Sequence, residues 1–136
     1  MIDWDALYEA ARAAREKAYA PYSKFKVGAA LLLADGRILP GCNVENRTFG
    51  LTICGERTAI ASAVAQGCRE FQAIAVVTDT SPPAVPCGLC LEMMNEFCRD
   101  LPVLVGNLQG DRKTYRLREL HPTPFEWPEN LEKPQM

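Results

Sequence analysis

Two short cysteine-containing stretches constrain the fold of this chain more than any other feature. The first, 52-TICGERTAIA-61, places Cys54 at the start of a helix-favouring segment. The second, 86-PCGLC-90, places Cys87 and Cys90 directly after a proline, again where a helix is predicted to begin. If the two predicted helices lie side by side, with the strand-length segment between them in the sheet, three thiols converge on one point.

The bulk properties of the chain indicate a globular protein with reduced thiols. Its 136 residues fit one domain, expected to span 1–136, around one core. The first 19 residues lack the basic start and apolar run of a secretory signal. We therefore expect a cytoplasmic protein, and in that compartment six cysteines favour metal binding or catalysis over a disulfide framework.

Charge and hydropathy argue against two classes of partner. The formal net charge of −2 gives no basic surface for phosphate contacts, so we expect no polymeric nucleic acid. No stretch is apolar enough to cross a bilayer, so we expect no membrane partner either.

The order of predicted elements indicates an α/β fold, a mixed sheet with helices packed on it. Apolar residues recur at helical spacing over 4–18, and Pro21 is expected to end that helix. The segment 27–44 predicts a β-hairpin around the Asp35-Gly36 turn, with Pro40 favouring an edge strand. The remaining predictions are helices at 54–64 and 88–98, strands at 73–78, 103–107 and 114–118, and a tail without regular structure that carries Pro122, Pro124, Pro128 and Pro134.

The two predicted helix starts supply the chemistry of a metal site. A helix N-terminus carries unpaired N–H groups and about half a positive charge, which favours thiolate over thiol. Three thiolates from Cys54, Cys87 and Cys90 suit Zn²⁺ and leave a fourth tetrahedral position open, as in catalytic sites. Glu56 is too close to Cys54 to share the metal comfortably. We therefore expect Glu56 to contact the metal's water and move its proton, a pattern typical of zinc deaminases.

The residue after this glutamate is a candidate for balancing charge. Three thiolates around Zn²⁺ leave a net charge of −1, which weakens the ability of the metal to acidify water. Arg57 is placed to donate hydrogen bonds to the ligand sulfurs and offset that charge.

Other functions share parts of this pattern. A non-catalytic module stabilised by zinc would use the cysteines and leave Glu56 dispensable. A thiol–disulfide oxidoreductase would use Cys87 and Cys90 without metal and would give Cys54 no role. The sequence also contains cysteines expected to be plain buried thiols, and one histidine in the proline-rich tail: Cys42, Cys68, Cys98 and His121.

Three stretches of the chain resemble one known family. They are 21-PYSKFKVGAAL-31, 41-GCNVENRTFGLTICGERTAI-60 and 86-PCGLC-90, and they are similar to the small, homotetrameric, three-cysteine cytidine deaminases. The resemblance implies a mixed five-stranded β-sheet sandwiched by helices, a three-layer α/β/α fold. It also implies zinc-dependent hydrolytic deamination of cytidine and 2′-deoxycytidine to uridine and 2′-deoxyuridine, with release of ammonia.

The resemblance assigns roles at the metal centre. One zinc per subunit would be held by Cys54, Cys87 and Cys90. Glu56 would move protons between the water, N3 of the base and the departing ammonia.

The resemblance also implies substrate contacts. Asn43 and Glu45 would bind the ribose 3′-hydroxyl, and their spacing agrees, because residues two apart on an extended strand face the same side. An amide and a carboxylate together can donate to and accept from a hydroxyl. Phe25 would pack against the pyrimidine. Phe125 would reach into the site of a neighbouring subunit, so that the homotetramer shares its active sites.

Several residues depart from the usual pattern of that family. Gly55 stands where alanine is common and is expected to line the pocket near the base. The missing methyl suggests a roomier pocket that accepts cytidines substituted at N4 or C5. A separate alternative is a deaminase of a related nucleoside, such as an antibiotic nucleoside. Leu91 and Glu92 follow the last cysteine, where arginine and glutamine are typical.

Overall fold

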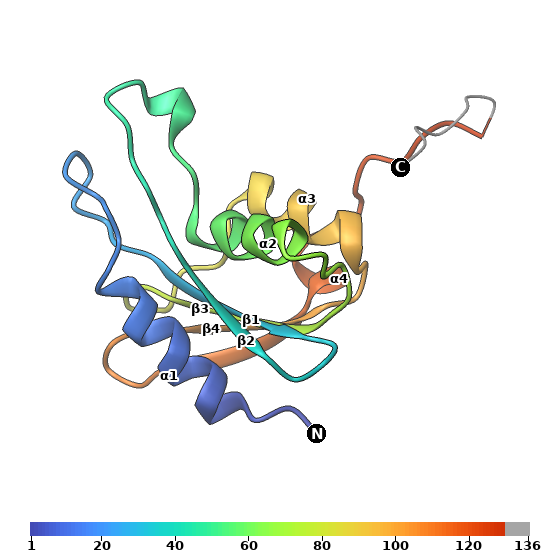
Figure 1. Ribbon diagram of the computed structural model, residues 1–136, viewed down its shortest axis with the longest axis horizontal. Helices are drawn as coiled ribbons and strands as arrows, with labels where there is room; N and C mark the ends of the chain where they lie inside the picture. The colour runs from blue at the N-terminus through green and yellow to red at the C-terminus, as the bar shows by residue number, and fades with distance from the viewer. Residues whose placement is uncertain (130–136) are drawn as a thin grey trace.

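A five-stranded sheet separates two layers of helices within residues 1–129, the part of the chain that this computed structural model describes (Figure 1). The strand order is β2-β1-β3-β4-β5, with β3 and β4 parallel and the other neighbours antiparallel. This confirms the predicted mixed five-stranded α/β/α fold. Along the chain the elements are α1 (Trp4–Arg15), β1 (Gly28–Leu33), β2 (Ile38–Cys42), η1 (Phe49–Leu51), α2 (Gly55–Ala65), β3 (Phe71–Val77), α3 (Gly88–Phe97), β4 (Pro102–Gly106), β5 (Arg112–Arg116) and α4 (Leu117–Leu120).

The predicted hairpin forms one edge of this sheet. β1 and β2 pair through the turn at Gly36, whose φ of +94° suits a residue without a side chain. Pro40 lies opposite Ala30 on β2, the outermost strand, where a missing N–H costs no ladder hydrogen bond. The edge position predicted for Pro40 is confirmed.

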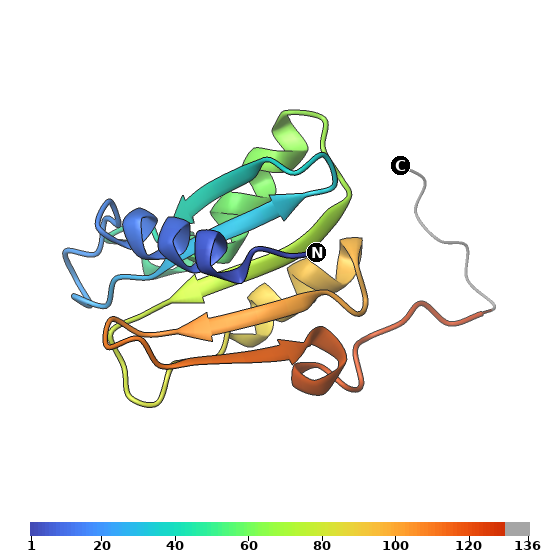
Figure 2. The same ribbon diagram turned by 90° about the horizontal axis from the view of Figure 1, so that it is seen from below.

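One face of the sheet is covered by α1 (Figure 2). Leu7, Tyr8 and Ala11 are fully buried and form a core cluster with alternate residues of the strands, including Ala30 and Ala75. These small strand residues let the helix approach closely. The Tyr8 hydroxyl crosses to the end of β4 and donates a buried 2.6 Å hydrogen bond to the carbonyl oxygen of Asn107.

The other face is covered by α2 and α3, which contact each other. Ile60 and Met94 are fully buried and pack with Leu31 and other strand residues in the second core cluster. Gly41 brings β2 against α2 at backbone distance, since a Cβ there would lie 2.4 Å from the carbonyl oxygen of Gly55. This layer fixes where both cysteine-bearing helices begin.

Several predicted boundaries shift by two or three residues, and two of these shifts have a clear cause in tertiary pairing and capping. The first helix ends at Arg15, not Ala18, because Tyr19 pairs with Val44 and its N–H donates to the carbonyl of Asn43. The last strand ends at Arg116, because the short helix α4 begins at Leu117. The N–H of Arg116 donates a hydrogen bond to the side chain of Glu119, which caps this helix.

The tail after α4 has no helix or strand through residue 129, as predicted for Pro122, Pro124 and Pro128. Pro134 lies outside the described residues. Among those residues, every helix is too short or too polar to span a membrane.

The close approach of α1 makes a stability prediction. A Cβ at Gly28 would lie 2.0 Å from the carbonyl oxygen of Ala11, so Gly28→Ala has to displace the helix from the sheet. We expect a loss of about 3 kcal/mol in the free energy of unfolding, the upper part of the usual range for overpacking. Urea denaturation measures it. Gly50→Ala is the control, because a Cβ at Gly50 meets nothing within 4 Å; equal losses in the two variants would contradict the prediction.

Candidate metal centre

The three predicted cysteines converge at the N-termini of α2 and α3. Cys54 and Cys87 are the residues immediately before each helix, both with extended backbone, and Cys90 is buried in the first turn of α3. The three sulfur atoms lie within 4.8 Å of one another. The Cys54 and Cys87 sulfurs are 3.8 Å apart, and those of Cys87 and Cys90 are 3.5 Å apart.

These separations fit a zinc ion. Two sulfurs bonded to zinc at about 2.3 Å with a tetrahedral angle are about 3.8 Å apart. The observed separations of 3.8 and 3.5 Å are therefore close to those of a tetrahedral thiolate site. Within residues 1–129 this is the single group of three metal-ligating side chains that could hold an ion. Three soft ligands leave one tetrahedral position for water or substrate.

Hydrogen bonds favour a negative charge on one of these sulfurs, that of Cys54. Hydrogen bonding with Cys90 lowers the pKa of the Cys54 thiol to about 5, with a further contribution from Arg57. The same interaction, together with burial, raises the pKa of Cys90. The Arg57 Nη2 atom donates to the Thr52 carbonyl oxygen at 3.2 Å and to the Cys54 sulfur at 3.7 Å. The structure thus brings Arg57 to the cysteine that it is predicted to neutralise.

Glu56 lies beside the sulfurs in a buried position. It is 3% exposed and shares the wall of one cavity with Cys54 and Cys87. Burial raises the pKa of its carboxyl to about 6. A carboxyl group with a pKa near neutrality can both take up and return a proton.

The cavity also contains three of the predicted substrate residues. It measures about 290 Å³, at the small end of the range for small-molecule sites. Phe25, Asn43 and Glu45 line it. The Asn43 amide accepts from the N–H of Val27 at 2.9 Å and donates to the Phe25 carbonyl at 2.7 Å. Asn43 and Glu45 are both buried, which is unusual for such polar side chains unless they are hydrogen-bonded.

Two other predicted residues do not line this cavity. A Cβ at Gly55 would point at the carbonyl oxygen of Val27, 3.2 Å away, and at the backbone of Cys42. The methyl that Gly55 lacks would therefore face the sheet. Phe125 is 68% exposed and stacks edge-on against Trp127 at 5.9 Å between ring centroids, in the tail that leaves the body of the molecule (Figure 1).

The acidic residue that follows the third cysteine faces away from the metal centre. Glu92 lies 3.1 Å from the Nε2 atom of His121, between α3 and the start of the tail. The negative charge that Glu92 brings, where the family typically has glutamine, therefore lies beside the start of the tail.

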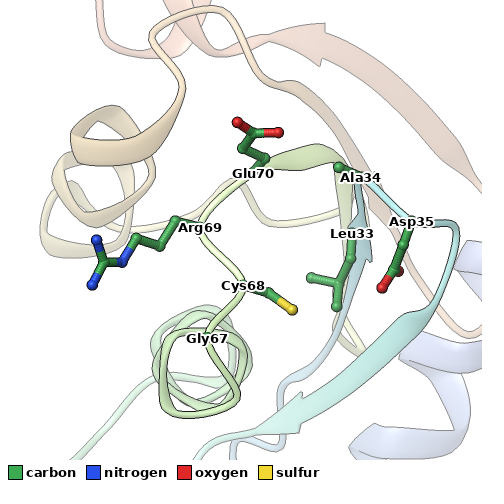
Figure 3. A pocket seen from close by; sticks show the side chains of 7 residues that line it. All are labelled: Leu33, Ala34, Asp35, Gly67, Cys68, Arg69 and Glu70. Atoms are coloured by element: carbon green, nitrogen blue, oxygen red, sulfur yellow. The ribbon is translucent and has the colours of Figure 1, made fainter.

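A second cavity, of about 360 Å³, lies at the opposite end of α2 (Figure 3). It is lined by residues 33–35 and 67–70, which include Cys68. No residue predicted to be functional lines it. The side chain of Arg37 donates to the Cys68 sulfur at 3.1 Å.

Sequence reasoning missed several residues of the metal-site cavity. Ser23, Thr52, Thr78 and Val85 line it and were assigned no role. Ser23 lies two residues before Phe25 in a stretch already singled out, which was an available signal. Thr78 follows a buried strand and carried no signal of its own.

Comparisons with known proteins agree with this site. Residues 1–105 match the family model of the cytidine and deoxycytidylate deaminase zinc-binding region. The chain is 50% identical to cytidine deaminase of Halalkalibacterium halodurans over 125 residues, which cover 91% of this chain and 95% of that protein. It is 48% identical to that of Sporosarcina psychrophila, with 91% and 92% coverage.

A solved structure is similar over the same extent. The crystal structure of cytidine deaminase from Burkholderia pseudomallei has a TM-score of 0.88 and 53% identity, covering 92% of this chain and all of that one. The chain belongs to the cytidine and deoxycytidylate deaminase family. The resemblance noted in the sequence is confirmed.

The geometry of the sulfurs predicts the metal content of cysteine variants. Cys87→Ala removes one of the three converging sulfurs, so we expect the purified variant to lose most of its zinc. Cys68→Ala, at the far end of α2, should keep about one zinc per chain. Elemental analysis of both proteins checks this, and zinc retained in Cys87→Ala at the wild-type level would exclude the site.

Proposed function

We propose that this protein is a zinc-dependent cytidine deaminase that converts cytidine and 2′-deoxycytidine to the corresponding uridines and releases ammonia. The observation that carries the proposal is one small cavity bounded by two of three converging cysteines, a buried glutamate and two buried polar residues. Family membership and the names of the relatives support it.

The metal would be one zinc ion per subunit, held by Cys54, Cys87 and Cys90. When bound, it would act as a Lewis acid and lower the pKa of a water molecule in the open position. The bound metal would keep the three thiols deprotonated, and Arg57 would offset part of their negative charge.

Glu56 would move the protons of the reaction. As a carboxylate it takes a proton from the attacking water and delivers it to N3 of the pyrimidine, which makes C4 more electrophilic. After water adds at C4, Glu56 carries the second proton to the amino group, which leaves as ammonia. Its buried position keeps bulk water away from this exchange.

The substrate would be a free nucleoside. Phe25 would pack against the pyrimidine, while Asn43 and Glu45 would bind the 3′-hydroxyl of the sugar. The small cavity and the net charge of −2 agree with a substrate that carries no phosphate chain.

The alternatives receive no specific support. A roomier pocket for N4- or C5-substituted cytidines was inferred from Gly55, whose absent methyl would face Val27 and the sheet. A thiol–disulfide oxidoreductase gives no role to Cys54 or to the buried Glu56. A non-catalytic zinc module leaves the same glutamate without a purpose.

The protein would work as a homotetramer in the cytoplasm. Phe125 lies outside the cavity of its own chain and is largely exposed, which supports its proposed insertion into a neighbouring site. Phe49 and Leu51, the first and last residues of η1, are also exposed, and burial of their apolar side chains between subunits would be favourable. Six free cysteines agree with a reducing compartment. Light scattering measures the molar mass of the assembly in solution and therefore tests whether it contains four subunits.

The role of Glu56 makes the first functional prediction. Glu56→Gln keeps the shape of the side chain and removes its ability to exchange protons. We expect turnover of cytidine to fall by about 10²–10⁴-fold with the zinc content unchanged. Glu96→Gln, on the exposed side of α3, is the matched control and should retain wild-type turnover. A Glu56→Gln enzyme with near-wild-type turnover would falsify the proposed function of this residue.

The position of Arg57 makes a second prediction. Arg57→Ala removes the donor 3.7 Å from the Cys54 sulfur and leaves the thiolate charge uncompensated. We expect turnover to fall by about 10–100-fold and zinc content to fall less, because all three ligands remain. Kinetics and elemental analysis on the same preparation measure both, with Arg69→Ala as the control. An unchanged rate would count against this assignment.

A further inference from the structure

Ser23 lines the nucleoside cavity, and the only proton of its hydroxyl group is already donated within the protein. The hydroxyl donates its one proton to Glu45 Oε2 and accepts the N–H of Phe25 at 3.0 Å. It therefore joins the residue proposed to bind the sugar to the residue proposed to pack on the base.

The carboxylate of Glu45 is almost fully occupied by the turn around it. Its Oε1 atom accepts the N–H groups of Tyr22 and Ser23 at 3.0 and 3.1 Å, and its Oε2 atom accepts the Ser23 hydroxyl. A carboxylate offers about four acceptor positions, so one is left on Oε2. These hydrogen bonds, the Ser23 hydroxyl first, lower the pKa of Glu45 and keep it a pure acceptor.

The backbone of the turn is strained in a way that depends on this arrangement. Lys24 has a φ of +62°, in the left-handed region that residues with a side chain rarely adopt. Such a conformation persists where the surrounding contacts determine it. Here the contacts of Glu45 hold the turn before Lys24, and the Ser23 hydroxyl holds Phe25 after it.

We propose that Ser23 is a positioning residue for nucleoside recognition: it holds Glu45 with a single acceptor position open to a sugar hydroxyl. This inference rests on the proposed function. Ser23 acts through Glu45, because a Ser23 hydroxyl that turned toward the sugar would release the carboxylate. The turn therefore favours a sugar whose hydroxyl donates a hydrogen bond to Glu45 Oε2. It affects substrate binding more than the proton transfers at Glu56.

The test compares two substrates and two variants by steady-state kinetics. With cytidine, Ser23→Ala should raise KM by about tenfold and leave kcat nearly unchanged, because a hydrogen bond to a charged group is lost from binding. With 3′-deoxycytidine, which has no hydroxyl for Glu45, Ser23→Ala should raise KM much less than with cytidine, because only the hydrogen bond to the Phe25 N–H is lost. Ser23→Thr, which keeps the hydroxyl, should restore discrimination between the two substrates.

A double-variant cycle gives an independent readout. In a Glu45→Gln background, Ser23→Ala should change KM for cytidine little, since the positioned carboxylate is already gone. Ser62→Ala removes a hydroxyl from α2 outside the cavity and controls for the loss of a serine. Thermal unfolding of each variant monitors the fold, and Ser23→Cys, a weaker donor of similar size, takes the place of Ser23→Ala if that variant does not fold.

The outcomes separate this inference from the proposed function. Equal increases of KM for cytidine and 3′-deoxycytidine, or no increase for either, would overturn the role of Ser23 and leave the deaminase proposal standing. Failure of the wild-type enzyme to turn over either nucleoside would overturn both.

Discussion

The meeting of two helix N-termini is the constraint on which the rest of the site depends. α2 and α3 lie on the same face of the sheet, with β3 between them in the chain, and their first residues lie within sulfur contact distance. Two such ends, each with about half a positive charge, would repel one another in isolation. Thiolate charge placed between them turns that repulsion into attraction. The cysteines and the helix arrangement therefore stabilise each other. The negative charge of three thiolates is larger than the positive charge of two helix N-termini, and Arg57 offsets part of the difference.

Features governed by local rules could be predicted from the sequence. The turn at Asp35-Gly36, the edge position of Pro40 and the helix starts at Cys54 and Cys87 each depend on a few adjacent residues. The sulfur cluster was predictable for the same reason. Once two neighbouring helices both begin at cysteines, few arrangements of the helices keep the thiols apart.

Features governed by contacts distant in sequence could not be predicted in this way. The first helix stops at Arg15 because Tyr19 pairs with Val44, a partner 25 residues away that no helical periodicity reveals. The direction of a methyl at Gly55 depends on how α2 packs over Val27. The sequence does not reveal this packing, so it could not show that the methyl would face away from the pocket. Ser23 acquires its partners only when the turn closes around Glu45.

The backbone contact at Gly41 has a consequence for how this enzyme can diverge. One short segment, 41–45, sets the height of α2 over the sheet through Gly41 and carries both Asn43 and Glu45. Altering sugar preference there risks moving the helix that bears Cys54. Ala84 and Val85 line the same cavity and carry neither of these roles, whereas Pro86 directly precedes the proposed ligand Cys87. New substrate ranges should therefore arise first on the wall formed by the loop before α3, while the 41–45 segment remains nearly fixed.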